Sequence, residues 1–218
     1  MNRGTPTVIY VDGFNLYYGA LKGSPYRWLN LDELFRKVFP HNHIVGIRYF
    51  TAAINALPHD PDQPTRQQLF WRALRTLPNL TLIEGHYLCH PKSMPLANPP
   101  AGGPRFAKVL FTEEKGSDVN LASYLLLDGF KAAYECAIVV SGDSDLATPI
   151  EMVRQELGKK VGVLLPQRAN QPNPRKSARL KQVATFFRDG IRDGVLAASQ
   201  FPGTLTDAQG TFTKPPAW

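Results

Sequence analysis

The sequence predicts an α/β domain of three layers, with helices on both faces of a mainly parallel central sheet. Its 218 residues are 43% hydrophobic, which is enough for one sizeable core. Short apolar runs of strand length alternate with segments whose apolar residues recur at helical spacing. The strand-like runs lack an alternation of polar and apolar residues, which is typical of strands covered on both faces. Such repeated strand–helix alternation favours parallel strands joined by right-handed crossovers.

The first half of the chain carries clear strand and helix signals. The run TVIYV is rich in β-branched residues and ends at Asp12-Gly13, so Asp12 is expected at the carboxyl end of a strand. Asn30 and Glu33 form a capping-box pattern ahead of apolar residues at helical spacing, and Pro40 ends that helix. The elements expected here are strands Thr7–Val11, Ile44–Ala52 and Leu80–Leu88 and helices Leu31–Val38 and Thr65–Leu77.

The second half continues the alternation after an interruption. Five prolines and two adjacent glycines between Cys89 and Arg105 predict an irregular excursion, either mobile or covering a site. The elements expected after it are strands Lys108–Thr112, Ala137–Ser141 and Lys160–Leu165, helices Asp118–Phe130 and Pro149–Leu157, and a short basic helix after Pro174. We expect residues 1–192 to form the domain and residues 193–218 to form a C-terminal extension.

The composition argues against a membrane-spanning or disulfide-rich protein. The longest apolar runs have strand length, and no signal-peptide pattern opens the sequence. The two cysteines, Cys89 and Cys136, lie in different kinds of segment, which fits a reducing compartment, and we expect a cytoplasmic protein. His86, Cys89 and His90 are close enough in sequence to suggest zinc, but no further ligand pair accompanies them, so incidental polar residues are the favoured interpretation.

The positive charge is concentrated in the last third of the chain. The formal net charge is +7; residues 1–153 carry 14 basic and 14 acidic residues, and the remainder carries 11 basic and 4 acidic residues. The following basic residues form a run with no acid among them: Arg168, Arg175, Lys176, Arg179 and Lys181. Such a run is typical of a face that binds a polyanion, and also of ordinary solvated basic loops.

Aspartates follow the expected strands at the edge where parallel α/β sheets bind ligands. Asp12 follows the first strand, Asp118 opens the helix after EEKG, and Asp143 and Asp145 lie in SGDSD after the strand AIVV. Four carboxylates at one edge repel one another unless a cation lies among them, and all-oxygen ligands suit Mg²⁺ or Mn²⁺.

Each aspartate also has a plain structural explanation. Asp12-Gly13 is a common turn, Asp118 is a good first-turn residue of a helix, and SGDSD is compatible with a turn followed by a helix cap. Turns and helix caps do not explain why successive strand ends all carry aspartate at positions that the topology brings together. The sequence therefore predicts a shared acidic site.

Three segments together resemble a known family. VDGFNLYYG, EEKGSDVNLASYLLLD and VVSGDSDLATPI resemble, in order and spacing, the motifs of NYN-domain proteins of the LabA-like type, relatives of the PIN nucleases. The resemblance runs from about Thr7 to Phe187. It implies a PIN-like fold and a ribonuclease site that depends on Mg²⁺ or Mn²⁺. The positions that match the catalytic and metal-binding acids are Asp12, Asp118, Asp143 and Asp145.

The same resemblance assigns roles to neighbouring residues. Asn15 matches the asparagine of the first motif and is expected to orient Asp12 or to donate to a phosphate, unless it only caps a helix. Lys115 matches the lysine of the second motif and is expected to hold the scissile phosphate or to lower a neighbouring pKa, unless it only compensates charge. The supporting positions are Ser141 as a donor to a carboxylate, Gly116 for close backbone approach, and Glu113 and Glu114 as weaker ligand candidates.

The favoured function is therefore hydrolysis of RNA phosphodiester bonds by a metal-activated water, leaving a 5′-phosphate. RNA is the expected partner, guided by the basic run; no membrane partner is expected, and assembly into a homo-oligomer stays open. Four aromatic residues are candidates for base stacking, although core packing explains most of them: Tyr17, Tyr18, Tyr26 and Trp28.

Two alternative functions share features with this sequence. A non-catalytic module that retains the metal site and binds RNA or a protein stays open. A phosphatase with an aspartyl nucleophile is disfavoured, because that class needs a second aspartate two residues after the first, and position 14 is Phe.

Overall fold

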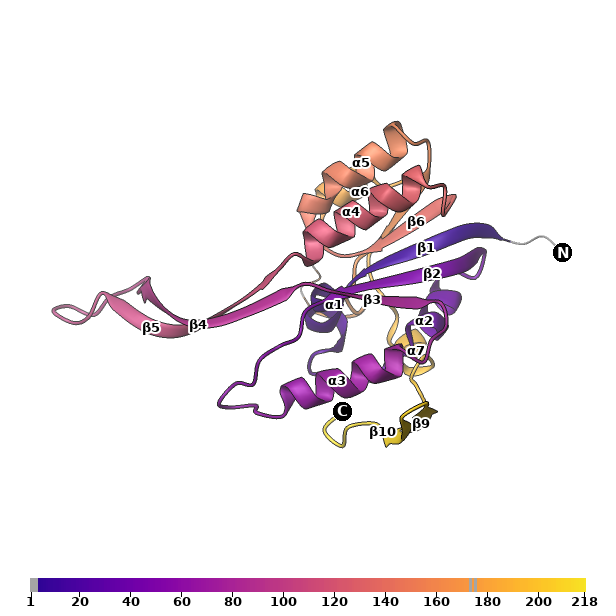
Figure 1. The fold of residues 1–218 in the computed structure, drawn as a ribbon. Helices are drawn as coiled ribbons and strands as arrows, with labels where there is room; N and C mark the ends of the chain where they lie inside the picture. Colours follow the sequence, from indigo (N-terminus) through magenta and orange to yellow (C-terminus); the bar gives the residue numbers. More distant parts are fainter. Residues whose placement is uncertain (1–3, 173, 175) are drawn as a thin grey trace.

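Six parallel strands form the centre of the molecule, in the order β3-β2-β1-β6-β7-β8 (Figure 1). The computed structural model describes residues 4–172, 174 and 176–218. The strands of this sheet are β1 Thr5–Asp12, β2 Asn42–Thr51, β3 Leu80–Glu84, β6 Cys136–Val140, β7 Lys160–Leu164 and β8 Phe186–Arg188. The chain moves outward from β1 to β2 and β3, and outward on the other side from β6 to β7 and β8. The predicted parallel sheet is confirmed.

Helices cover both faces of this sheet (Figure 1). Alternate residues of β1 point into two separate cores, since Ile9 and Val11 belong to one cluster and Val8 and Tyr10 to the other. The helices on the Ile9 face are α2 Leu31–Val38, α3 Gln63–Leu74 and α7 Asp193–Ala197, and those on the Val8 face are α4 Ser117–Phe130, α5 Ala147–Gln155 and α6 Ala178–Val183. The expected three-layer α/β/α architecture is therefore present.

Short helical turns follow the strands at the centre of the carboxyl edge. They are α1 Gly13–Leu16, the π-helix η1 Tyr17–Leu21, and the 3₁₀-helix η2 Ser144–Leu146. The predicted cap of α2 is confirmed, since the Glu33 backbone N–H donates to Asn30 Oδ1 at 3.1 Å.

The segment after β3 differs from the sequence prediction. The expected strand Leu80–Leu88 ends at Glu84, and the expected irregular excursion contains β4 His86–Pro95, which pairs antiparallel with β5 Phe106–Lys115. We call this two-stranded ribbon, residues 86–115, the arm; it projects from the body of the protein (Figure 1). Proline is tolerated in β4 because each strand of an isolated ribbon has one free edge, where no N–H is needed for pairing. Lys108–Thr112 is a strand as predicted, but it belongs to the arm.

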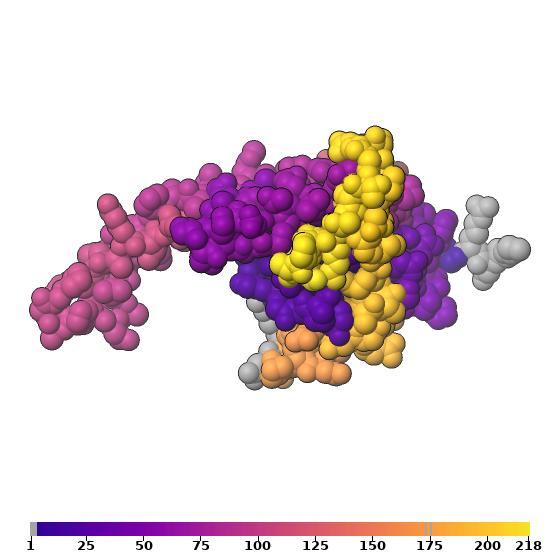
Figure 2. Space-filling model, turned by 90° about the horizontal axis from the view of Figure 1, so that it is seen from below, coloured from indigo at the N-terminus to yellow at the C-terminus, as the bar shows by residue number. Residues whose placement is uncertain are grey.

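Residues 193–218 pack on the body. The hairpin β9 Thr204–Asp207 and β10 Gly210–Thr213 is tied to α3 by Arg72, which makes two hydrogen bonds of 2.7 Å to the carboxylate of Asp207. The Trp28 indole N–H donates to the Pro202 carbonyl at 2.8 Å. Figure 2 shows this segment, in yellow, lying across the indigo and purple parts of the chain. Among the helices of the described residues, none is both long and apolar enough to cross a bilayer.

Candidate functional site

The acidic residues predicted from the sequence gather at the carboxyl edge of the central strands. Asp12 is the last residue of β1, and the strand order diverges there, with β2 on one side of β1 and β6 on the other. This divergence is the topological switch point at which open α/β sheets bind ligands. Asp143 follows β6, and Asp118 lies in the first turn of α4, so carboxylates from three segments approach one point of the edge.

Asp12 is held by hydrogen bonds in a buried position. Its side chain is 3% exposed and accepts hydrogen bonds from the Asn15 backbone at 2.9 Å, the Asn15 amide at 2.5 Å and Ser141 Oγ at 2.9 Å. Burial raises the pKa of Asp12, and the hydrogen bonds from Asn15 and Ser141 oppose that rise. The carboxylate therefore has a fixed orientation.

Asn15 and Ser141 also connect Asp12 to the loop after β6. The Gly142 N–H points to Asn15 Oδ1 at 3.4 Å, and the Asp143 N–H donates to Ser141 Oγ at 3.1 Å. Asp143 in turn accepts the Asp145 N–H at 2.9 Å and caps η2. The structure thus places Asn15 in the orienting position predicted for it, and Ser141 next to the carboxylate.

The pKa of Asp118 shows that the acidic side chains lie close enough to act on one another. The pKa of Asp118 is raised to about 6, by burial first and then by the charges of Asp12, Asp143, Glu114 and Asp145, in that order. Each of the four predicted aspartates is therefore close enough to act on the site, and Glu114 joins them.

Glu114 contributes more to the acidic site, and Lys115 less, than the sequence suggested. Glu114 Oε1 accepts the Ser117 N–H at 2.9 Å, which brings its carboxylate to the start of α4 beside Asp118. Lys115 is more than half exposed and pairs with Glu113 at 3.3 Å. Gly116 links β5 to α4 with a φ of 95°, a left-handed conformation that favours glycine. The available signal for Glu114 was its position three residues before the first residue of α4, where a carboxylate can cap the helix.

The donor chemistry at this edge suits a hydrated hard cation. Carboxylate oxygens are the ligands preferred by Mg²⁺ and Mn²⁺. Within the described residues, no three Asp, Glu, His or Cys side chains are arranged to hold a metal ion directly. Mg²⁺ usually keeps several waters and binds through one or two carboxylates and substrate phosphates, so this arrangement fits a cation that bridges to a ligand rather than a closed cage.

Two arginines of the basic run already have acidic partners within the protein. Arg168 lies 3.7 Å from a carboxylate oxygen of Asp193, and Arg179 lies 3.2 Å from one of Glu151. Both acids are distant in sequence from their partners. Lys176 and Lys181 are exposed, and Arg175 lies outside the described residues. Positive charge at this face therefore depends mainly on the lysines among the described members of the run.

The aromatic candidates divide between core and surface. Trp28 is completely buried, so its proposed contact with a base is wrong for this conformation. Tyr17 and Tyr26 pack against the core. Tyr18 is 52% exposed and lies parallel to Phe14, with ring centroids 6.5 Å apart. Tyr18 is thus the most exposed of the four, and Tyr17, which is half-buried, lines a cavity beside it.

The residues considered for zinc lie along β4. Side chains alternate between the two faces of a strand, so Cys89 points to the face opposite His86 and His90. The three side chains cannot converge on one ion in this strand.

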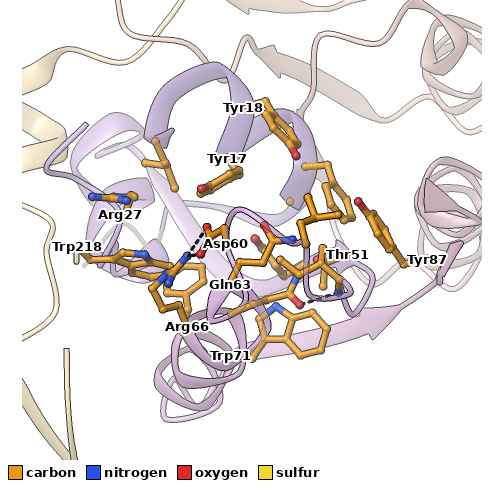
Figure 3. A pocket seen from close by; sticks show the side chains of 18 of the residues that line it. Tyr17, Tyr18, Arg27, Thr51, Asp60, Gln63, Arg66, Trp71, Tyr87 and Trp218 are labelled. Carbon is orange, nitrogen blue, oxygen red and sulfur yellow. Dashed lines mark hydrogen bonds and ion pairs between the residues drawn. The ribbon is translucent and has the colours of Figure 1, made fainter. Parts of the chain in front are cut away.

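A cavity of about 190 Å³ opens beside the acidic site (Figure 3). Gly13 and Phe14, the residues directly after Asp12, line it, and Tyr49 forms part of its wall. Burial, followed by the charge of Asp12, raises the pKa of Tyr49, so this tyrosine of the cavity wall also lies near the Asp12 carboxylate. The cavity and the acidic site are therefore neighbours.

Comparison with known proteins identifies the family of the chain and a similar fold. The chain is 33% identical over 97% of its length to 6-hydroxy-3-succinoylpyridine 3-monooxygenase HspA of Pseudomonas putida (strain DSM 28022 / S16), of which it covers 75%. The crystal structure of VPA0982, a protein of unknown function from Vibrio parahaemolyticus RIMD 2210633, matches with a TM-score of 0.55 at 20% identity, over 88% of this chain and 96% of that one. That likeness concerns the fold alone. The NYN domain matches residues 6–189, and the chain therefore belongs to the NYN-domain family, as its three motifs indicated.

Proposed function

We propose that this protein is a divalent-metal-dependent ribonuclease that hydrolyses RNA phosphodiester bonds at the acidic site. The observation that supports this most directly is the meeting of Asp12, Asp118, Asp143 and Asp145 at the switch point, where burial and then the charges of the other acids raise the pKa of Asp118. Membership of a family related to PIN nucleases agrees with this proposal. A bound Mg²⁺ or Mn²⁺ supplies charge stabilisation for phosphate and lowers the pKa of water there.

The residues of the chain have separate tasks in this proposal. Asp12 is the fixed member of the site, because Asn15 and Ser141 restrain its oxygens. With a pKa of about 6, Asp118 holds a proton in mildly acidic solution when the site lacks a cation, and it releases that proton as a cation binds. Lys115 stays a proposed phosphate contact, which requires it to leave Glu113.

The direct test is cleavage of a labelled RNA with Mn²⁺ and with EDTA. In Asp143→Asn or Asp12→Asn we expect cleavage to fall by roughly two orders of magnitude or more, because a ligand charge is lost. Asp62→Asn is the matched control, since Asp62 lies in the turn before α3 and makes no side-chain cap. Full activity in a folded Asp143→Asn protein would reject the nuclease proposal. RNA binding without cleavage in Mn²⁺ would favour the non-catalytic module instead.

A second candidate is the oxygenation of a small aromatic ring. The named activity of the Pseudomonas putida relative and the aromatic cavity beside Asp12 favour it. The test is oxygen consumption with 6-hydroxy-3-succinoylpyridine and a reduced nicotinamide, followed by product analysis. Substrate-dependent consumption in this assay, without RNA cleavage, would replace the first candidate by the second.

A further inference from the structure

The cavity beside the acidic site has aromatic walls drawn from distant parts of the chain. Tyr17 and Tyr18 come from η1, Trp71 from α3, Tyr87 from the base of the arm, and Trp218 from the C-terminal segment. Phe14 lies parallel to Tyr18 at an interplanar angle of 14° and to Tyr87 at 11°. Walls of this kind accept a flat aromatic ring. A volume of about 190 Å³ holds a ligand of one or two rings.

Two long polar side chains in the cavity wall, Gln67 and Arg66, already have partners within the protein. Gln67 accepts the Ile54 N–H at 3.0 Å and donates to the Ala52 carbonyl at 3.0 Å. Arg66 pairs with both oxygens of Asp60. These groups shape the wall and have little hydrogen-bonding capacity left for a ligand.

Arg27 is different. Its Nη2 donates to the Ala217 carbonyl at 2.5 Å, whereas its Nε is buried and has no hydrogen-bond partner. No carboxylate among the residues that the structure describes lies within ion-pair distance of its guanidinium. Figure 3 shows Arg27 and Trp218 on one side of the pocket and Tyr87 on the other. A guanidinium with unused donors is suited to a carboxylate or a phosphate.

We propose that this cavity binds a flat aromatic ring that carries one anionic group, with the ring against the aromatic walls and the anion at Arg27. Two sources have this chemistry. One is a nucleotide of the RNA held at the proposed nuclease site, and the other is a free heteroaromatic carboxylate. The nucleotide source rests on the proposed nuclease function, whereas binding itself does not require cleavage.

The test measures binding to the full chain in EDTA, by tryptophan fluorescence and by calorimetry. The anionic probes are AMP, CMP and nicotinate, and their uncharged counterparts are adenosine, cytidine and nicotinamide. Because Trp71 and Trp218 line the cavity, we expect saturable quenching by an anionic probe. We expect its uncharged counterpart to bind at least roughly tenfold more weakly, since a charge-assisted hydrogen bond is missing. Comparing the two probes on the unaltered protein requires no variant.

Arg27→Gln is expected to weaken the anionic probe roughly tenfold or more and to leave the uncharged probe unchanged. Arg36→Gln, a change on the exposed side of α2, is the matched control. Binding of nucleotides alone assigns the cavity to a base of the RNA, and binding of nicotinate alone assigns it to a small-molecule ligand. Failure of every anionic probe to saturate, or equal binding by Arg27→Gln, would overturn the proposal.

The two proposals fail separately. Asp143→Asn is expected to lose cleavage and to keep probe binding, because Asp143 does not line the cavity. Probe binding by a protein that never cleaves RNA would retain the cavity proposal and reject the nuclease. RNA cleavage by a protein that binds no anionic probe would do the reverse.

Discussion

Asp118 is the residue at which the shared acidic site has a measurable consequence. Its pKa is raised from 3.8 to about 6, by burial first and by neighbouring carboxylates second. A carboxyl group whose pKa rises on folding binds its proton more tightly in the native state. Its contribution to stability is therefore fully present below the unfolded-state pKa and is lost as the pH rises through about 6.

Asp118→Asn, which cannot ionise, is expected to melt higher than wild type in EDTA at about pH 8, and the difference is expected to vanish near pH 4. The same variant is expected to gain less from added Mn²⁺, because stabilisation by a ligand follows its affinity. Thermal melts in EDTA and in Mn²⁺ at both pH values provide the measurement.

If Asp118 has no part in the shared site, the change in stability expected for Asp118→Asn has the opposite sign. If Asp118 only starts α4, its replacement by Asn removes a favourable interaction with the helix dipole, worth about 0.3–1 kcal/mol. The variant then melts lower in EDTA and responds to Mn²⁺ like wild type. That combination would show that Asp118 does not belong to the shared site.

At the scale of elements, the loop after β7 and the helix α6 carry the basic run. Because Arg168 and Arg179 have acidic partners, the exposed Lys176 and Lys181 are the better candidates for phosphate contacts among the described members of the run, and Arg175 stays a candidate from the sequence alone. If the three residues Arg175, Lys176 and Lys181 contact phosphates, replacing them by Gln is expected to reduce the slope of log affinity against log salt by about two for single-stranded RNA.

The control for this prediction is the pair Arg36→Gln and Lys37→Gln in α2, whose cations already pair with acids one turn away. Binding isotherms at several salt concentrations provide both slopes. An unchanged slope in the triple variant would place the RNA path on another face of the protein.

The arm shows why some elements could not be predicted from local patterns. Its prolines predicted irregular structure, yet they occupy a ribbon whose strands pair only with each other. Whether a strand joins a sheet depends on what lies beside it, and β5 has β4 as its neighbour rather than any strand of the central sheet. The helix cap of Asn30 was predicted because it involves residues within one turn, whereas the cap that Asp12 provides for α1 was not predicted.

At the scale of the whole molecule, the C-terminal segment completes the cavity wall. Trp218 makes edge-to-face contacts with Trp28 and Phe70, with ring centroids 6.2 Å and 5.7 Å apart. Residues 193–218 were expected as an extension, and in the structure they pack on the side of the sheet that carries α3.

Trp218→Ala is expected to lower the free energy of unfolding by about 1–3 kcal/mol, because two aromatic pairs are lost. Trp218→Phe is expected to retain most of that stability, since a ring remains at the same place. Urea unfolding of both variants measures the difference. Equal stability of Trp218→Ala and wild type would show that the C-terminal segment is not tied to the body in solution.

Local patterns in the sequence predicted five of the six strands of the parallel sheet, most of its helices, and the four aspartates at the carboxyl edge, but not β8. These follow from apolar periodicity, caps and turns, which act over a few neighbouring residues. The tertiary structure determines which basic side chains are neutralised, since Asp193 and Glu151 reach Arg168 and Arg179 from distant elements. It also decided that Glu114 joins the acidic site, and that residues from η1, α3, the arm and the C-terminal segment enclose one cavity. The ion pairs and the cavity walls join segments that are far apart along the chain, and no local pattern encodes them.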